Sequence, residues 1–258
     1  MKHKENNKKT ISIANQKGGV GKTTTAINLG ASLAIAEKNV LIVDIDAQAN
    51  STTGLGVEKG TVEKDIYSVL AGNVSIKDAV LDYDLKFLKI IPSSRNLARF
   101  EMEISGEENN HLYLKNVLAE VRDEYDYIII DSPPSLGLLT INALTASDSV
   151  LVPIQTEYYA LEGLSDLIST IDRTRENFNP DLEIEGILLT MYDERTNLSK
   201  QVEEEIRDYF KAKVYRSIIP RNIRLSEAPS FGKPIQLYAI KSAGSVAYMS
   251  LAREIMKK

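Results

Sequence analysis

Short apolar runs, each about the length of a buried strand, recur along the chain and alternate with stretches of helical periodicity. Such runs are typical of strands buried on both faces, and they lie at 11–14, 40–46, 87–91, 127–131, 149–154 and 184–190. Helical patterns are expected at about 24–34, 66–70, 76–81, 111–122, 157–178, 198–210 and 245–258. The repeated order of strand then helix, with right-handed crossovers, predicts an α/β fold: a mainly parallel twisted sheet with helices on both faces.

The pattern continues without an internal repeat or a flexible linker, so we expect one domain over residues 10–258. The 258 residues are 43% hydrophobic and 26% charged, which is ordinary for a globular protein with a sizeable core. Residues 1–9 differ because they hold four lysines and almost nothing apolar. We expect a mobile basic tail there, and contact between its lysines and DNA is the alternative.

Charge and cysteine content exclude several classes of function. A net charge of −5 is not that of a protein coated in basic surface, so any contact with nucleic acid must be a local patch. The chain has no cysteine, which rules out disulfides, thiolate metal sites and cysteine-held iron–sulfur clusters. No apolar run approaches the roughly 20 residues that span a bilayer, and the N-terminus lacks the apolar segment of a secretion signal. We therefore expect a cytoplasmic protein.

A glycine-rich turn follows the first strand and precedes the first helix, where residues 11–25 read ISIANQKGGVGKTTT. Glycines let backbone N–H groups surround an anion without a Cβ in the way, and the helix N-terminus adds partial positive charge. In the general phosphate-loop pattern Lys22 then reaches the β- and γ-phosphates and Thr23 ligates Mg²⁺. The residues expected to bind the nucleotide here are Lys17, Gly18, Gly19, Val20, Gly21, Lys22, Thr23 and Thr24.

Carboxylates follow two of the other predicted strands. Asp44 and Asp46 end the run at 40–46, and Asp131 ends a second run and precedes two prolines that force a turn. Ligands of open parallel sheets bind at the carboxyl ends of the strands, which is also the edge where the glycine loop must lie. Aspartates in a turn are common, but beside a phosphate loop they predict a Mg²⁺ site.

Several segments together resemble the ParA/MinD group of ATPases. The loop lacks the first glycine of the general pattern, because position 16 is Gln16, and opens with Lys17 in KGGVGKT, the deviant Walker A motif of that group. The stretches at 44–48 and 131–144 are similar to two further nucleotide motifs of ParA proteins. The stretch IPRNIRLSEAPS at 219–230 is similar to Soj-type members. The resemblance covers nearly the whole chain after the tail and predicts a P-loop NTPase fold of the deviant Walker A class.

This resemblance implies an ATPase that works as an ATP-bound sandwich dimer. In the group the extra lysine, here Lys17, reaches the ATP of the partner subunit, and the second acid, here Asp46, positions the hydrolytic water. Asp44 and Asp131 are expected near Mg²⁺ through water. The resemblance assigns catalysis to Lys17, Lys22 and Asp46, Mg²⁺ to Thr23, Asp44 and Asp131, and the border of the adenine to Pro220 and Asn222.

It also implies non-specific DNA binding and a partner protein. Arg195 and Arg224 are candidates for contacts with DNA phosphates, joined by Lys241. Lys241 lies in a departure from the family, since YAIKS at 238–242 lacks the usual aspartate and proline. No base-reading element is visible, so binding should be independent of sequence. The homodimer would occupy the nucleoid and leave it when a ParB-type centromere-binding protein stimulates hydrolysis of ATP to ADP.

Other functions use the same kind of loop. A MinD-like protein would use the switch to bind a membrane, but the last helical stretch, at 245–258, looks more like a core helix than an added amphipathic anchor. A nucleotide-switched scaffold without turnover would not need Asp46. A bacterial tyrosine kinase of related fold would carry a tyrosine cluster near its end, where this chain has isolated tyrosines at Tyr238 and Tyr248.

Overall fold

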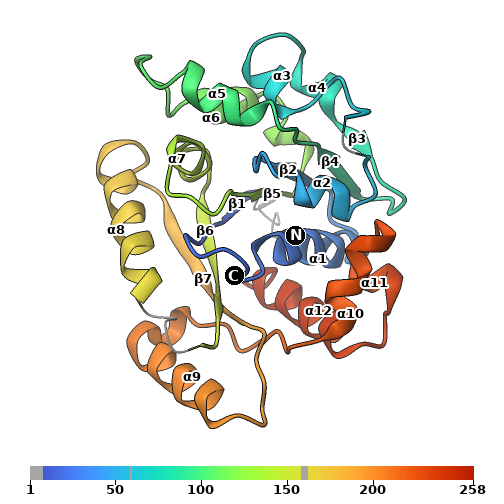
Figure 1. Ribbon diagram of the computed structural model, residues 1–258, viewed down its shortest axis with the longest axis vertical. Coiled ribbons are helices and arrows are strands. Elements are labelled where there is room, and N and C mark those ends of the chain that lie inside the picture. Colours follow the sequence, from blue (N-terminus) through green and yellow to red (C-terminus); the bar gives the residue numbers. More distant parts are fainter. Residues whose placement is uncertain (1–7, 59, 158–161) are drawn as a thin grey trace, which may run out of the picture.

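The computed structural model describes residues 8–58, 60–157 and 162–258 (Figure 1). Its centre is a seven-stranded sheet in the order β3-β4-β2-β5-β1-β6-β7, in which only the pairing of β3 with β4 is antiparallel among the described strands. The predicted mainly parallel sheet is confirmed. The strands are β1 Lys9–Ile13, β2 Val40–Asp44, β3 Leu81–Asp82, β4 Leu88–Ile91, β5 Tyr127–Asp131, β6 Ser149–Gln155 and β7 Glu183–Thr190.

Helices cover both faces of this sheet. One face carries α1 Lys22–Ile35, α2 Asn50–Gly54, α10 Ile223–Glu227, α11 Ile235–Tyr238 and α12 Ala243–Ile255. The opposite face carries α3 Ile66–Leu70, α4 Ile76–Ala79, α5 Leu97–Glu103, α6 Tyr113–Ala119 and α7 Leu138–Thr145. The edge formed by β6 and β7 is covered by α8 Glu162–Asn177 and α9 Asn197–Phe210 (Figure 1). Short 3₁₀ turns lie at Arg122–Glu124, Lys211–Lys213 and Ala228–Phe231.

Alternate residues of each strand bury opposite faces, which explains why the strands read as continuous apolar runs. In β5, Ile129 packs with α1 and α12, whereas Ile128 and Ile130 pack with α3 to α7. In β2, Ile42 packs on the face covered by α1 and α12, and Leu41 packs on the face covered by α3 to α7. Because side chains alternate with a period of two, a strand covered on both faces needs apolar residues at every position.

The central strand β1 lies where the chain changes direction across the sheet. It pairs with β5 on one side and with β6 on the other, so the carboxyl ends of β1, β2 and β5 meet at one edge. The register places Asp131 opposite both Ile13 and Asp44. Open α/β sheets bind ligands at such switch points, and here the glycine loop and two of the predicted acids are brought there together.

Several predicted boundaries are wrong. The helix expected at 111–122 is shorter, because α6 ends at Ala119 and Arg122 turns away to pair with Asp148 through two hydrogen bonds of 2.7 and 2.8 Å. The helix expected from 157 begins at Glu162 within the described residues, and 158–161 lie outside them. The segment at 214–220 forms only isolated parallel bridges, of Val214 with Ile187 in β7 and of Pro220 with Tyr192 just after it.

The boundary of the tail also moves. Lys9, which the sequence assigned to the tail, opens β1, and Lys8 pairs with Asp123 at 3.1 Å. Residues 1–7 lie outside the described part of the chain. Lys9 is held by Glu185, whose side chain is only 2% exposed and lies 2.5 Å from the lysine Nζ. The Ser149 hydroxyl donates to the same carboxylate at 2.7 Å, and Lys258 lies 3.6 Å away.

Glu185 predicts a pH dependence of stability. Burial by itself raises the pKa of Glu185, but hydrogen bonds from Lys9 and Ser149 outweigh it and hold that pKa below its usual value. A depressed pKa stabilises the fold above the unfolded-state pKa, and the contribution is lost as the pH falls through the folded-state value. We expect Glu185→Gln to lower the free energy of unfolding by about 1–3 kcal/mol at neutral pH, and by less below about pH 4.3. Urea denaturation over a pH series measures this, and the exposed neighbour Glu183→Gln is the control; equal effects of the two variants would contradict it.

Candidate nucleotide and metal site

The loop between β1 and α1 has the backbone that an anion site needs. Gly19 and Gly21 have φ of 77° and 91°, in the left-handed region that side-chain-bearing residues rarely adopt. A Cβ on Gly18 or Gly19 would meet nothing within 4 Å, so the loop is open on this side. Gly21 precedes α1, and the helix begins with Lys22. The loop therefore directs a helix N-terminus and free backbone donors at one point.

Two polar residues that sequence reasoning missed hold this loop in place. The Asn15 side chain donates to the Pro153 carbonyl at 2.7 Å and accepts from the backbone N–H of Lys17 at 2.9 Å. The Thr190 hydroxyl, at the end of β7, donates to the carbonyl of Val20 at 2.8 Å. Both ties join the loop to neighbouring strands. The signal for Asn15 was present, since a buried polar residue between an apolar strand and a glycine loop needs a partner.

Lys22 begins α1 and lies across the glycine loop from Lys17. Its side chain is 7% exposed at the residue level, and its Nζ donates to the Lys17 carbonyl at 3.1 Å across the loop. Burial lowers the pKa of Lys22, and the charges of Asp131 and Asp46 partly offset this by raising it. Because burial is the larger effect, a polyphosphate bound in the loop would stabilise the charged form of Lys22.

Asp131, at the end of β5, contacts the first turn of α1. Its Oδ2 accepts from the Thr23 hydroxyl at 2.8 Å and from the Ser51 hydroxyl at 2.8 Å. Its Oδ1 is buried with no hydrogen-bond partner. Burial raises the pKa of Asp131, and the charge of Asp44 raises it further. A buried carboxylate oxygen without a hydrogen-bond donor destabilises the fold unless a cation or a water molecule binds to it.

These oxygens fit Mg²⁺. The Thr23 hydroxyl and the orphaned Oδ1 of Asp131 are hard oxygen donors at one edge of the sheet. In the described part of the chain, no group of three or more His, Cys, Asp or Glu side chains is arranged to hold a metal ion by itself. In nucleotide sites Mg²⁺ is usually held by one or two carboxylates together with substrate phosphates and water.

Asp44 and Asp46 have different surroundings. Asp44 is fully buried; its Oδ2 accepts from the backbone and hydroxyl of Thr52, and its Oδ1 accepts from the backbone of Asp46. Burial raises the pKa of Asp44 against these hydrogen bonds. Asp46 is 8% exposed, and its Oδ1 accepts from the backbone N–H of Gln48 at 2.9 Å. Asp44 thus organises the loop after β2, and Asp46 lies at the rim of the site.

Lys17 pairs within its own chain. Its Nζ lies 3.3 Å from Oε2 of Glu157, just after β6, and the two side chains are 39% and 51% exposed. A partly exposed pair of this kind contributes at most about 1 kcal/mol, so it is easily exchanged for a better partner. Glu157 is a functional candidate that sequence reasoning missed, because it is 140 residues away from Lys17.

A cavity of about 550 Å³ continues from the loop toward the C-terminal part of the chain. It is lined by both residues that were predicted to border the adenine, Pro220 and Asn222, and by Gly21 and Thr24 of the loop. The side chain of Asn222 accepts from the backbone N–H of Arg224 and so caps α10. The structure therefore brings the two distant segments together around a space that suits a nucleoside. The other lining residues are Thr190, Met191, Ile219, Arg221, Ile223, Leu225, Ser226, Pro229 and Tyr248.

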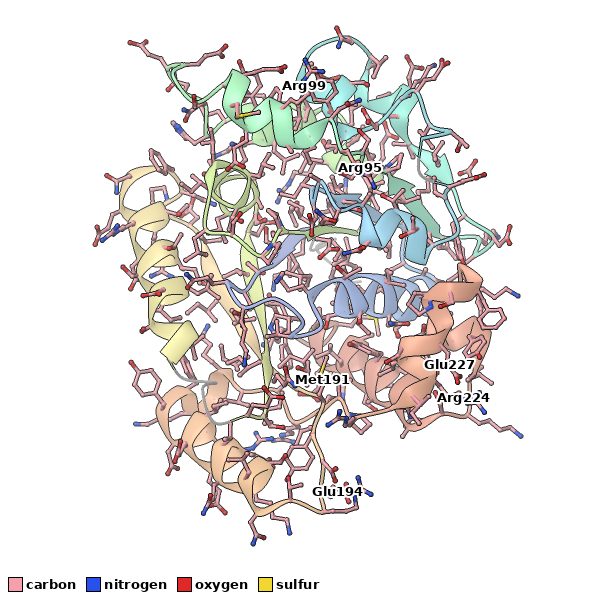
Figure 2. The ribbon with its side chains drawn as sticks, in the orientation of Figure 1. Arg95, Arg99, Met191, Glu194, Arg224 and Glu227 are labelled. Carbon is pink, nitrogen blue, oxygen red and sulfur yellow. The ribbon has the colours of Figure 1, made fainter. Side chains whose placement is uncertain are left out.

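The three candidates for DNA contact are on the surface of separate elements. Arg195 follows β7, is 87% exposed and pairs with Asp193 at 2.7 Å. Arg224 on α10 is 59% exposed and pairs with Glu227 at 2.8 Å. Lys241 is exposed just before α12, within a turn in which the Ser242 N–H donates to the Ala239 carbonyl. In Figure 2, Glu194, next to Arg195 in sequence, lies at the bottom of the view, and Arg224 lies at the lower right.

Comparisons with known proteins agree with this geometry. A family model described as an AAA domain matches residues 8–184. The chain is 54% identical over 248 residues to a chromosome partitioning protein ParA of Myxococcus xanthus, covering 96% of this chain and 88% of that protein. It is 55% identical over 247 residues to the sporulation initiation inhibitor protein Soj of Bacillus subtilis, covering 96% and 98%. The chain belongs to the ParA/Soj family of partitioning ATPases.

A solved structure shows what this fold can hold in another protein. Cobyrinic acid a,c-diamide synthase from Mycobacterium smegmatis, with bound ADP and magnesium, matches with a TM-score of 0.86 and 34% identity over 96% of this chain and 94% of that one. ParA/Soj proteins are P-loop ATPases. Within the described ranges, no helix combines the length and the apolar content needed to cross a bilayer.

Proposed function

We propose that this ParA/Soj protein is an ATP-dependent DNA-partitioning ATPase whose ATP-bound dimer binds DNA non-specifically. The observation that carries the proposal is the convergence at one sheet edge of the glycine loop, Lys22, the pair of Thr23 with Asp131, and Asp46. The adjoining cavity, bordered by Pro220 and Asn222, would take the nucleoside. ATP is the nucleotide implied by family membership.

The chain's own residues divide the work of hydrolysis. Lys22 would bind the β- and γ-phosphates, and the backbone N–H groups after Gly19 would bind the oxygens that face the loop. Thr23 directly, and Asp131 and Asp44 through water, would hold Mg²⁺, which neutralises charge on the phosphates when bound. Asp46 would orient the attacking water from the rim of the site. Removal of the γ-phosphate then takes away the negative charge that Lys22 and the loop neutralise.

Lys17 would couple hydrolysis to dimerisation. Its exposed pair with Glu157 is weak enough to be replaced by a stronger contact with the triphosphate of a second subunit. A cation that reaches the partner's phosphates acts as an arginine finger does, which is worth about 10³ to 10⁵ in rate. ATP would thereby hold two chains together, and its hydrolysis would release them.

The distribution of charge supports DNA binding by the C-terminal region. Residues 211–258 carry ten lysines and arginines and two glutamates, although the whole chain has a net charge of −5. Arg224 and Lys241 belong to this region, and Arg195 lies on the loop before α9. A dimer presents two such surfaces, so a contact too weak in one chain is retained through effective concentration. A ParB-type partner would trigger release from the nucleoid in the cytoplasm.

Retention on DNA in the presence of ATP, ADP or no nucleotide, measured over a salt series, tests this function. We expect retention with ATP alone, and log affinity should fall with log salt by about 0.9 for each neutralised phosphate. Retention that does not depend on nucleotide would overturn the proposal in favour of simple coating of DNA. Binding to liposomes without binding to DNA would overturn it in favour of a membrane-directed ATPase.

Single arginine substitutions are expected to weaken DNA binding without changing ATP hydrolysis in the absence of DNA. Arg195→Ala and Arg224→Ala should each lower the salt slope by about 0.9 per lost phosphate contact, to a similar degree on unrelated DNA sequences. Arg99→Ala is the matched control, because Arg99 is an exposed arginine on α5, and Figure 2 shows it far from Arg224. An equal loss in the control would show that only total charge matters.

A further inference from the structure

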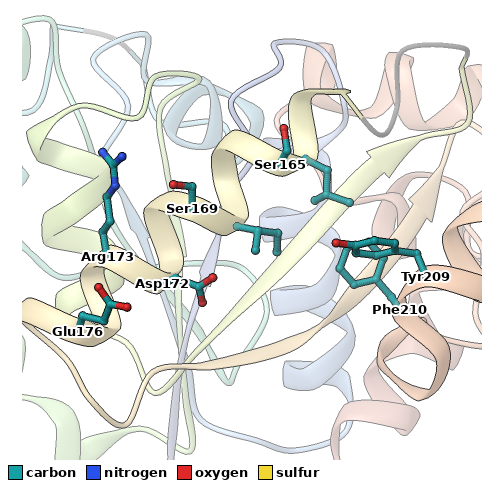
Figure 3. A pocket seen from close by; sticks show the side chains of 9 residues that line it. Ser165, Ser169, Asp172, Arg173, Glu176, Tyr209 and Phe210 are labelled. Carbon is teal, nitrogen blue, oxygen red and sulfur yellow. The ribbon is translucent and has the colours of Figure 1, made fainter.

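An open groove lies between α8 and the end of α9 (Figure 3), and it shares no lining residue with the cavity beside the glycine loop. It encloses about 570 Å³. Its floor is apolar, with Leu164 and Ile168 from α8 and Phe210 from α9, and Tyr209 forms one wall with a side chain that is 74% exposed. The rings of Tyr209 and Phe210 meet edge to face, with centroids 4.7 Å apart. A large aromatic residue exposed beside an apolar floor is typical of an interaction site.

The groove is long enough along α8 for a short helix, and α9 contributes Tyr209 and Phe210 to its lining. Its lining residues on α8 run from Leu164 to Glu176, which is about 18 Å at 1.5 Å per residue. They follow helical spacing along one side of α8, and the serine at Ser169 is small enough to let another helix approach. A strand is a poorer fit, because the outer edge of β7 is already bonded to the segment at 214–220 through Tyr215 and Ile219.

The charge around the groove favours a basic occupant. Asp172 and Glu176 lie one turn apart on α8, and Arg173 also lines the groove (Figure 3). Asp172 is paired with Arg175 at 2.8 Å. The sequences of α8 and α9 together hold eight carboxylates and four cations, so these two helices have a net negative charge. A positively charged helix would be attracted to them over several ångströms.

We propose that the groove between α8 and α9 docks a basic amphipathic helix of a partner protein, with apolar side chains on Leu164, Ile168 and Tyr209 and cations beside Asp172 and Glu176. This inference goes beyond the proposed function, because it requires neither ATP nor DNA. Binding through an apolar face laid into a groove is a common mode of helix recognition. Contact with Tyr209 would supply most of the affinity, and Asp172 and Glu176 would select for a positively charged helix.

Fluorescence anisotropy with designed peptides tests the proposal on the full chain. The probes are a helical peptide of about three to four turns with leucines at i, i+3, i+4 and i+7 and lysines elsewhere, and the same peptide with glutamate for each lysine. We expect the lysine peptide to bind with a micromolar Kd and the glutamate peptide at least about tenfold more weakly. The preference should reverse in the Asp172→Lys, Glu176→Lys double variant.

Two further variants separate the groove from general charge attraction. Tyr209→Ser, at an exposed position that the fold does not need, should weaken binding of the lysine peptide at least about fivefold. The matched charge reversal Glu103→Lys, Glu120→Lys, at exposed positions at the ends of α5 and α6 that do not line the groove, should leave it unchanged. Failure of the preference to reverse, an unaffected Tyr209→Ser variant, or an equal loss in the control would each overturn the proposal. Loss of DNA retention would not bear on it, since these measurements contain neither nucleotide nor DNA.

Discussion

Asp46→Ala is expected to abolish steady-state ATP hydrolysis while ATP still binds. Asp46 is the acid at the rim of the site, and removing a group that orients or deprotonates the attacking water costs about 10² to 10⁴ in rate. Lys22, Thr23 and Asp131 are untouched, so affinity for ATP should stay within a few-fold of the wild-type value. Phosphate release measures the first effect, and binding of a fluorescent ATP analogue measures the second.

The same variant should remain bound to DNA for longer. A dimer that cannot hydrolyse ATP keeps the triphosphates that hold its two subunits together. Asp46→Asn is the matched variant: its amide oxygen can still accept from the Gln48 N–H, which preserves the local turn, but its charge is lost. We expect it to be nearly as inactive as the alanine variant. Hydrolysis at the wild-type rate in both would contradict the role of Asp46 and favour a scaffold that does not depend on this acid.

Lys17→Ala is expected to abolish ATP-dependent dimers. In the single chain Lys17 makes only a partly exposed pair with Glu157, so its removal should cost little stability. In the dimer it would neutralise triphosphate charge across the interface, where the effect on rate is about 10³ to 10⁵. Light scattering with ATP and with ADP measures dimerisation directly.

Two other lysine variants make this result specific. Lys22→Ala removes the contact within the same chain and should lose ATP binding itself, whereas Lys17→Ala monomers should still bind ATP. Lys115→Ala removes an equal charge from an exposed position on α6 and should dimerise normally. Intact ATP-dependent dimers of Lys17→Ala would reject the role across the subunit interface.

The local chemistry could be predicted from sequence because it depends on neighbouring residues. Gly19 and Gly21 need positive φ, Lys22 follows at the helix start, and the apolar run before Asp131 must be a buried strand. These requirements act over a few residues, so composition and spacing are enough to reveal them. The mainly parallel sheet followed from the same logic, since repeated strand and helix patterns with right-handed crossovers leave few arrangements.

Other features depend on packing between distant segments. Thr23 meets Asp131 across 108 residues, and Thr190 meets Val20 across 170, because strands far apart in the chain are neighbours in the sheet. The early end of α6 has the same cause, since Arg122 is drawn to Asp148. Periodicity cannot show such contacts, and boundary errors arose where they override local preference.

The sequence by itself determined the phosphate loop, its acids and the family, because each is written in a short run of residues. Only the tertiary structure decided that Pro220 and Asn222 share a cavity with Gly21, that Lys17 rests on Glu157, and that a groove lies between α8 and α9. Each of these depends on the distance between segments that the sheet brings together, and that distance is set by the packing of the whole core rather than by any local pattern.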